Sequence, residues 1–193
     1  APADGREARV AGALEAVLSQ TARLETLVSS LLALTQPFHA ERQAVDLLAW
    51  LEERRNAHAE AAQKKGVRIT LAVEPGLTAS AKEVALFDPA QMARVFDNLL
   101  LNALAHTGEH GEIELGAHRT RRGALLLGVA EDGCGIPADL RDTLFEPFAT
   151  NRAGGTGLGL ALVREIVQGH GGRVGLAKST KGTRIEMELP WPE

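Results

Sequence analysis

The sequence lacks several features that would define its class at once. It has one cysteine, Cys134, in 193 residues, so it cannot form an internal disulfide, which agrees with a reducing compartment. It has no basic excess of the kind that marks nucleic-acid binding, because its formal net charge is −4. No apolar run approaches the roughly 18 residues of a membrane span, and residues 1–4 lack the charged-then-apolar start of a secretory leader. We therefore expect a cytoplasmic globular protein whose partners are neither nucleic acid nor a membrane.

The first part of the chain has a heptad pattern. Positions separated alternately by four and three residues are Val10, Leu14, Val17, Thr21, Leu24, Val28, Leu31 and Thr35. This 3.5-residue repeat predicts a long helix that packs in a bundle or coiled coil; the alternative is an amphipathic helix lying on the rest of the same chain. Pro37 ends the helix because it lacks an N–H and clashes with the preceding turn. We expect a helix and linker in residues 1–45 and a second domain in residues 46–193.

The second domain alternates between helical and strand patterns. A helix is expected over residues 46–65, and another begins at Pro89, with Asp88 as its N-cap. A turn is expected at residues 138–143, a loop at 145–157 and a last helix at 158–168. The alternating patterns predict strands at residues 67–73, 84–87, 113–117, 125–130, 174–177 and 183–189. Mixed strands with helices on one face predict an α/β two-layer sandwich.

Two asparagines lie one helical turn apart on the helix that begins at Pro89. Asn98, Asn102 and His106 share one face of it, while apolar residues can face the sheet. An amide oxygen can ligate Mg²⁺ without adding charge, although such a pair can also be merely exposed. The glycine-rich segments that follow favour the ligand interpretation.

The first glycine-rich segment is Asp132-Gly133-Cys134-Gly135. Because glycine has no Cβ, a planar base can approach closely, and the Asp132 carboxylate can accept a hydrogen bond from an exocyclic amine. The alternative is a tight turn closed by an Asx hydrogen bond. Cys134 is interpreted as a small residue filling this turn, with a redox sensor as the alternative.

The second segment, residues 154–159, leads into a helix, whose N-terminus favours phosphate. It is not a Walker loop, because no Gly-Lys-Ser or Gly-Lys-Thr follows. It is not a Rossmann fingerprint either, because a loop precedes it instead of a strand.

Together these motifs resemble the ATP-binding catalytic domain of sensor histidine kinases, in the Bergerat-fold (GHKL) superfamily that also holds gyrase, MutL and Hsp90-type ATPases. Residues 98–107 resemble the N box, 132–135 the first glycine box, 144–148 the F box, 155–160 the second glycine box, and 182–183 a weaker terminal glycine signal. The resemblance implies ATP and Mg²⁺ as cofactors, with Asn102 on the metal, Asp132 on the adenine amino group and residues 149–157 as the ATP lid. The full set of nucleotide-binding residues that it implies is Asn98, Asn102, His106, Asp132, Gly133, Gly135, Ile136, Phe145, Thr150, Arg152, Gly155, Thr156, Gly157, Leu158, Gly159, Leu160 and Thr183.

The sequence departs from the family pattern in one informative place. Many members carry a lysine three residues after the magnesium asparagine, where this chain has Ala105. The short lid is similar to that of the nitrogen-regulation type of histidine kinase, which also tends to lack this lysine. Arg152 is the expected substitute, a cation that closes on the γ-phosphate; the alternative is a solvated loop arginine.

The heptad helix fits the same family. Residues 24–32 resemble the second helix of its dimerisation and phosphoacceptor hairpin, which forms a four-helix bundle. The family's acceptor histidine precedes an acidic residue, and no histidine here does, so we expect the acceptor outside this chain; His58 is expected to pack in the protein interior. The partners implied are a response regulator receiver domain, a hairpin from the parent protein or in trans, and a second copy in the intact kinase, whose parent can be a membrane-bound sensor.

Three classes of function remain open. A phosphotransferase would use Asn98, Asn102 and Arg152 to pass the γ-phosphoryl of ATP to a histidine. An ATPase of the gyrase or Hsp90 kind needs a glutamate base where this chain has Asn98, and an amide cannot take the proton. A nucleotide-binding dimeric scaffold, or pseudokinase, would differ only in lacking turnover, and a serine-kinase anti-sigma factor would not be expected to carry the heptad helix. The sequence favours the histidine kinase.

Overall fold

The computed structural model describes residues 9–14, 17–18, 20–21, 28, 40–77, 85–150 and 156–191. The chain divides into two units, Ala1–Pro37 and Phe38–Glu193. In the first unit the described residues are helical, and Val10, Leu14 and Val28 are exposed. Most of the predicted heptad helix lies outside the described residues, so the long helix and the domain limits at residues 45 and 46 stay predictions.

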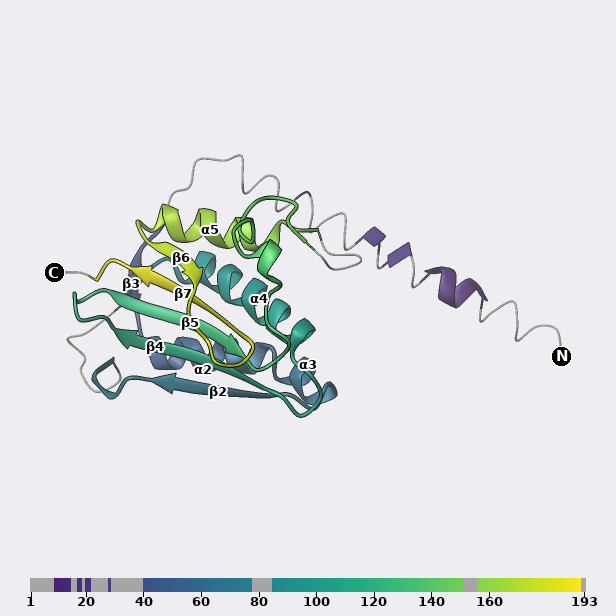
Figure 1. The fold of residues 1–193 in the computed structure, drawn as a ribbon, viewed down its shortest axis with the longest axis horizontal. Coiled ribbons are helices and arrows are strands. Elements are labelled where there is room, and N and C mark those ends of the chain that lie inside the picture. The colour runs from purple at the N-terminus through teal and green to yellow at the C-terminus, as the bar shows by residue number, and fades with distance from the viewer. Residues whose placement is uncertain are drawn as a thin grey trace. The chain divides into compact units, whose positions relative to one another are not determined.

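The second unit is a two-layer α/β structure, as the sequence predicts (Figure 1). Its five-stranded sheet has the order β2-β4-β5-β7-β6, in which β2 and β4 are parallel and the other neighbours antiparallel. The strands are β2 (Arg68–Val73), β4 (Glu112–Arg119), β5 (Leu125–Glu131), β6 (Arg173–Leu176) and β7 (Thr183–Leu189). The helices α2 (Leu47–Ala57), α4 (Pro89–His106) and α5 (Gly159–Gly169) lie against β2, β5 and β6 respectively. None of the helices in the described part of the chain is both long and apolar enough to cross a membrane.

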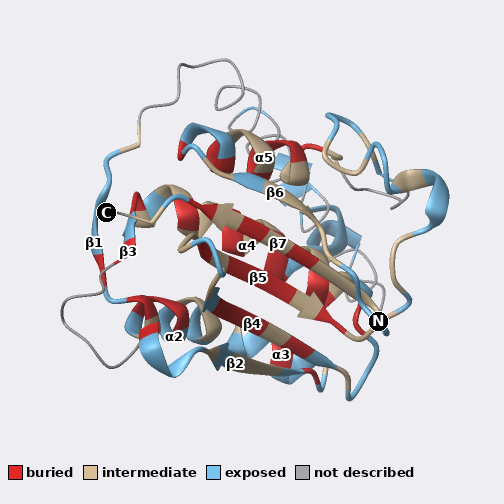
Figure 2. Cartoon of the chain, turned by 60° about the vertical axis from the view of Figure 1, so that its left-hand side comes forward, coloured by how far each residue is buried: buried red, intermediate tan, exposed pale blue. Residues whose placement is uncertain are grey.

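The core lies between the helices and the sheet. Buried residues recur along β4 and β5, including Ile113, Leu115 and Leu127, and α4 packs against β5 (Figure 2). Helix α4 begins as expected, because the Asp88 carboxylate accepts hydrogen bonds from the backbone N–H groups of residues 90 and 91 and Pro89 takes the first helical position. This buried packing fixes the direction of α4, and therefore the face that carries the two asparagines.

The single helix predicted over residues 46–65 is wrong, because the structure has two helices, α2 and α3 (Ala59–Lys64). The backbone of His58 leaves the helical conformation at φ −106° and ψ 3°. Its imidazole Nε2 lies 2.9 Å from Asp97 Oδ1 on α4, and its side chain is 12% exposed. The residue at the break therefore makes a polar contact with α4. Its largely buried imidazole agrees with the packed side chain expected from the sequence.

The sequence also missed strand β1 (Gln43–Val45), which pairs antiparallel with β3 (Ala85–Phe87) in a small second sheet. Two 3₁₀ helices, η1 (Pro75–Leu77) and η2 (Ala138–Leu140), complete the connections, and η2 takes the place of the predicted turn. The β1 residues Gln43, Ala44 and Val45 show no clear alternation of apolar and polar side chains, unlike the longer strands. The expected strands in the larger sheet are present, with ends that differ by at most two residues.

Candidate functional site

Helix α4 presents the polar face that the sequence predicts. Asn98 and Asn102 are half-buried, and His106, one turn further on, is exposed. The Asn98 amide nitrogen donates to the backbone oxygen of Arg94 at 2.7 Å. A Cβ on Gly159, the first residue of α5, would lie 2.6 Å from Asn98 Oδ1. The second glycine box therefore starts its helix directly against the first asparagine, and a larger residue at 159 would separate the two.

The N-terminus of α5 is suited to an anion. Thr156 Oγ1 accepts from the backbone N–H of Leu158 at 3.3 Å, and Leu158 is buried beneath the turn. Within the described residues no side chain caps the start of α5, and its first turn has no acidic residue. Backbone N–H groups and the positive end of the helix dipole are available there to a phosphate.

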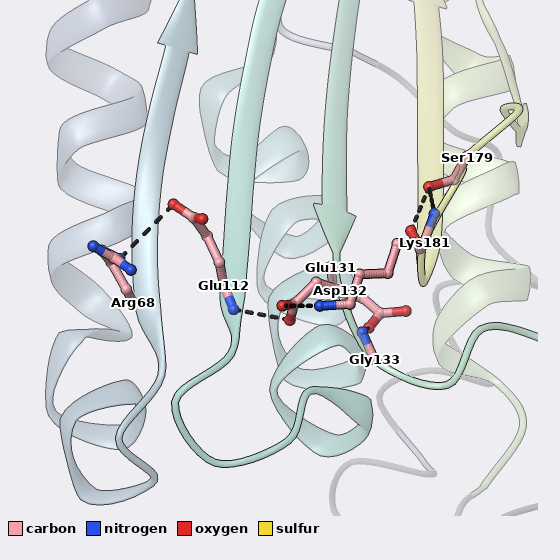
Figure 3. A network of polar contacts seen from close by, with 7 residues as sticks. All are labelled: Arg68, Glu112, Glu131, Asp132, Gly133, Ser179 and Lys181. Carbon is pink, nitrogen blue, oxygen red and sulfur yellow. Dashed lines mark hydrogen bonds and ion pairs between the residues drawn. The ribbon is translucent and has the colours of Figure 1, made fainter.

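The predicted adenine acceptor, Asp132, follows β5 directly. Its Oδ1 accepts from the backbone N–H of Glu112 at 2.9 Å, and its Oδ2 lies 2.8 Å from the Lys181 ammonium (Figure 3). The hydrogen bond from Lys181, followed by that from the Glu112 backbone, lowers the pKa of Asp132 below its ordinary value. The carboxylate is therefore ionised at neutral pH and can accept a hydrogen bond from a base amino group.

The first glycine box packs against the end of α4. A Cβ on Gly133 would collide with the backbone oxygen of His106 and with the Glu131 side chain, which is buried and accepts from the Gly133 N–H. Thr183, the first residue of β7, pairs with Glu131 across the sheet. The N box, the first glycine box and the terminal glycine signal thus meet at one end of the sheet.

The F box is held by contacts at Glu146 and at Phe148, its last residue. The Phe148 N–H donates to the backbone oxygen of Gly157 at 2.9 Å, which brings the two sides of the predicted lid together. Gly157 has φ +67°, and a Cβ there would lie 2.5 Å from the Phe148 carbonyl carbon. Glu146 Oε1 accepts from the Arg164 guanidinium of α5 at 2.7 Å, and this hydrogen bond lowers the pKa of Glu146. Arg152 and Gly155, between these points, lie outside the described residues.

Several of the predicted site residues therefore lie against one another in the fold, namely Asn98 and Gly159, and His106 and Gly133. Ile136, Phe145 and Leu160 are half-buried, and Thr150 is exposed at the start of the lid. Every described residue that the sequence analysis assigned to the nucleotide lies on α4, on the segment from β5 to α5, on α5 itself or at the start of β7.

Comparison with known proteins agrees with this geometry. The family described as "Histidine kinase-, DNA gyrase B-, and HSP90-like ATPase" matches residues 87–193, which is more than half of the chain. The chain belongs to this family. The ATPase family resemblance inferred from the boxes is thereby confirmed.

Relatives that this chain matches carry names of sensor histidine kinases. Sensor histidine kinase ZraS of Escherichia coli (strain K12) is 34% identical over 191 residues, which cover 98% of this chain and 39% of ZraS. The chain thus spans about two fifths of the length of that curated relative. In structure it resembles full-length ShkA solved with AMPPNP, with a TM-score of 0.77 and 26% identity over 91% of this chain and 38% of ShkA. Histidine kinase ThkA, solved in complex with response regulator protein TrrA, shares the fold at a TM-score of 0.75, with 24% identity over 91% of this chain and 49% of ThkA.

Two residues that contact the first glycine box were not identified from the sequence. Glu131 reads as the end of a strand, and only the fold shows that its carboxylate holds the Gly133 N–H. Lys181 is one of two lysines in the loop between β6 and β7, and no local pattern indicates that its ammonium contacts Asp132, 49 residues earlier.

Proposed function

We propose that this chain is the ATP-binding catalytic core of a two-component sensor histidine kinase. It binds Mg²⁺-ATP and transfers the γ-phosphoryl group to a histidine outside the chain. The observation that supports this most is that two of the boxes pack along α4: Gly159 starts α5 against Asn98, and Gly133, next to Asp132, lies against His106 at the end of the helix. The ATPase description of the family and the AMPPNP in ShkA support ATP as the nucleotide.

The residues have separate roles in this proposal. Asp132 accepts from the adenine amino group, and the first turn of α5 binds phosphate oxygens. Asn102 supplies an uncharged oxygen ligand for Mg²⁺, and Asn98 lies beside it toward α5. When bound, Mg²⁺ neutralises charge on the phosphates. Arg152 supplies the remaining cation at the γ-phosphate, in place of the lysine that Ala105 replaces.

In this transfer the chain positions ATP and stabilises charge, and it forms no covalent bond to the phosphoryl group. The bond between the γ-phosphorus and the bridging oxygen breaks, a nitrogen–phosphorus bond forms on the acceptor imidazole, and ADP leaves. Cations and helix dipoles around the phosphates stabilise the charge that ADP gains. A water-activating carboxylate is not needed, which agrees with an amide at position 98.

The partners follow from the same proposal. The phosphorylated histidine would donate its phosphoryl group to a response regulator receiver domain. The complex of ThkA with response regulator TrrA supports a partner of this kind. A homodimer is supported by the exposed apolar positions Val10, Leu14, Val17 and Val28, because a stripe of this spacing is normally buried against another helix. We place this chain in the cytoplasm, whether or not the parent kinase is bound to a membrane.

Phosphotransfer can be tested directly. The chain is mixed with Mg²⁺ and γ-labelled ATP, with and without a kinase-dead polypeptide that carries the missing hairpin helix. We expect label on the polypeptide histidine only when both proteins are present. Nucleotide binding without label or phosphate release would favour the dimeric scaffold, whereas release of labelled phosphate without the polypeptide would favour an ATPase.

A further inference from the structure

The Asp132 carboxylate already has both of its oxygens engaged. The backbone N–H of Glu112 binds Oδ1, and the position of that N–H is fixed because Glu112 begins β4 and Ile113 pairs with Glu131. The Lys181 ammonium binds Oδ2 from a side chain that is 69% exposed. Of these two contacts, only the one from Lys181 can move away without disturbing the sheet.

The fold keeps Lys181 near this carboxylate. Lys181 lies two residues before Thr183, which pairs with Glu131, the residue preceding Asp132. Ser179 Oγ accepts from the Lys181 backbone N–H at 3.4 Å and donates to its backbone oxygen, so the loop is closed on itself (Figure 3). The ammonium therefore has a short tether to Asp132, and the ion pair can form again each time the site is empty.

We propose that Lys181 is a competitive latch on the base-binding site. Its ammonium occupies the Asp132 oxygen to which an adenine amino group would bind, and it must leave before the base is accepted. This inference rests on the proposed function, because it takes Asp132 as the adenine acceptor. The latch lowers the affinity for the nucleotide. This effect becomes smaller as ionic strength rises, because salt screens an exposed ion pair.

The size of the effect follows from the exposure of the pair. Exposed ion pairs are weak, so releasing the ammonium should cost no more than about a fivefold factor in affinity. Adenosine is the sharpest probe, because it carries the amino group but no phosphate charge. Its affinity for the wild-type chain should rise with salt, whereas a ligand with phosphates would add a salt dependence of its own.

The test compares Lys181→Gln with Lys178→Gln, a matched loss of charge at an exposed position of the same loop. Adenosine is titrated by NMR at about 0.01 M and about 0.15 M salt, where the Debye length is about 30 Å and about 8 Å. At low salt we expect Lys181→Gln to bind adenosine about two- to fivefold more tightly than wild type, with an affinity that no longer changes with salt. Lys178→Gln should match wild type at both salt concentrations.

Asp132→Asn separates failure of the latch from failure of the proposed function. If Asp132→Asn loses adenosine binding but Lys181→Gln binds like wild type or more weakly, the latch is wrong and the adenine role of Asp132 stands. If Asp132→Asn binds adenosine as wild type does, both the adenine role and the latch are overturned. An equal gain in Lys178→Gln would assign the effect to net charge and would also overturn the latch.

Discussion

His170, at the end of α5, should make the stability of this chain depend on pH. Its side chain is buried with 2% of the residue exposed. Nε2 accepts from the backbone N–H of Asp88 at 3.0 Å, and Nδ1 lies 2.8 Å from the backbone oxygen of Ile166. The partners assign the neutral tautomer with hydrogen on Nδ1, which satisfies both contacts. The imidazole thus joins the C-terminus of α5 to the first turn of α4.

Burial lowers the pKa of His170 below its ordinary value of 6.5, and the nearby Arg42 charge lowers it further. The unfolded chain therefore binds a proton at a higher pH than the folded chain does. The stability that neutral His170 contributes is fully present above about pH 6.5, and it falls as the pH drops toward the lower folded pKa. One proton gives a slope of at most about 1.4 kcal/mol per pH unit in the free energy of unfolding.

The variant His170→Gln cannot titrate in this range. It should lower the free energy of unfolding at neutral pH by about 2 to 4 kcal/mol, because one hydrogen bond is lost and the buried Asp88 N–H loses its partner. Urea unfolding of both proteins, followed by tryptophan fluorescence, measures this at about pH 7.5 and about pH 5.5, and we expect the difference between them to shrink at the lower pH. His110→Gln is the matched control, since the His110 side chain is 84% exposed.

A parallel loss of stability in wild type and His170→Gln between the two pH values would refute this assignment. Asp132 and Glu146 do not confuse the comparison, because their pKa values are lowered from ordinary values of 3.8 and 4.5. Any stability that depends on those two carboxylates is lost only as the pH falls below these ordinary values, which is below the range measured.

Four further predictions concern the site and its support. Asn102→Ala should reduce the gain in ATP affinity that added Mg²⁺ brings, and titrations at several Mg²⁺ concentrations check this against an unchanged metal dependence. Arg152→Ala should weaken ATP more than ADP, by about five- to thirtyfold in calorimetry, and equal losses would remove the γ-phosphate contact. Gly157→Ala should lower the free energy of unfolding by at least about 1 kcal/mol, because its φ of +67° is strained for alanine, and urea unfolding would contradict this if stability were unchanged. Phe96→Ala, at a fully buried residue of α4, should cost about 3 to 5 kcal/mol in the same assay, and a loss below about 1 kcal/mol would show that Phe96 is not part of the core.

The parts of the fold that the sequence predicts well are those where local signals agree. The cap at Asp88, the proline at 89 and the apolar face of α4 point to the same helix, and the structure confirms it. The strands of the larger sheet are also predicted well, because their alternation of apolar and polar residues extends over several positions. The break at His58 was not predicted, because no local signal marks it and the partner of the His58 imidazole, Asp97, lies 39 residues away on another helix.

In the candidate site too, local sequence signals predict some features, and contacts between distant residues are not predicted. The glycine boxes predict where the backbone must approach closely, and the structure gives Gly133 and Gly159 such neighbours. Lys181 could not be predicted, because its contact with Asp132 exists only after β7 has paired with β5. A single charged residue in a loop acquires its contacts only from the fold. A sequence motif therefore indicates Asp132 but gives no indication of Lys181, which contacts it.

The two ends of the site have different structural support, and this separates what their variants should do. The proposed base-binding end is built from strand ends, since Asp132 follows β5, Glu112 starts β4 and Thr183 starts β7. The proposed phosphate-binding end depends on the first turn of α5 and on the hydrogen bond between Phe148 and Gly157. Changes at Asp132 or Lys181 should therefore alter the affinity for adenosine, ADP and ATP by similar factors. Changes at Arg152 should weaken ATP more than ADP and leave adenosine unchanged. Titrating the three ligands against the same set of variants therefore tests whether the base and the phosphates are bound by separate groups of residues.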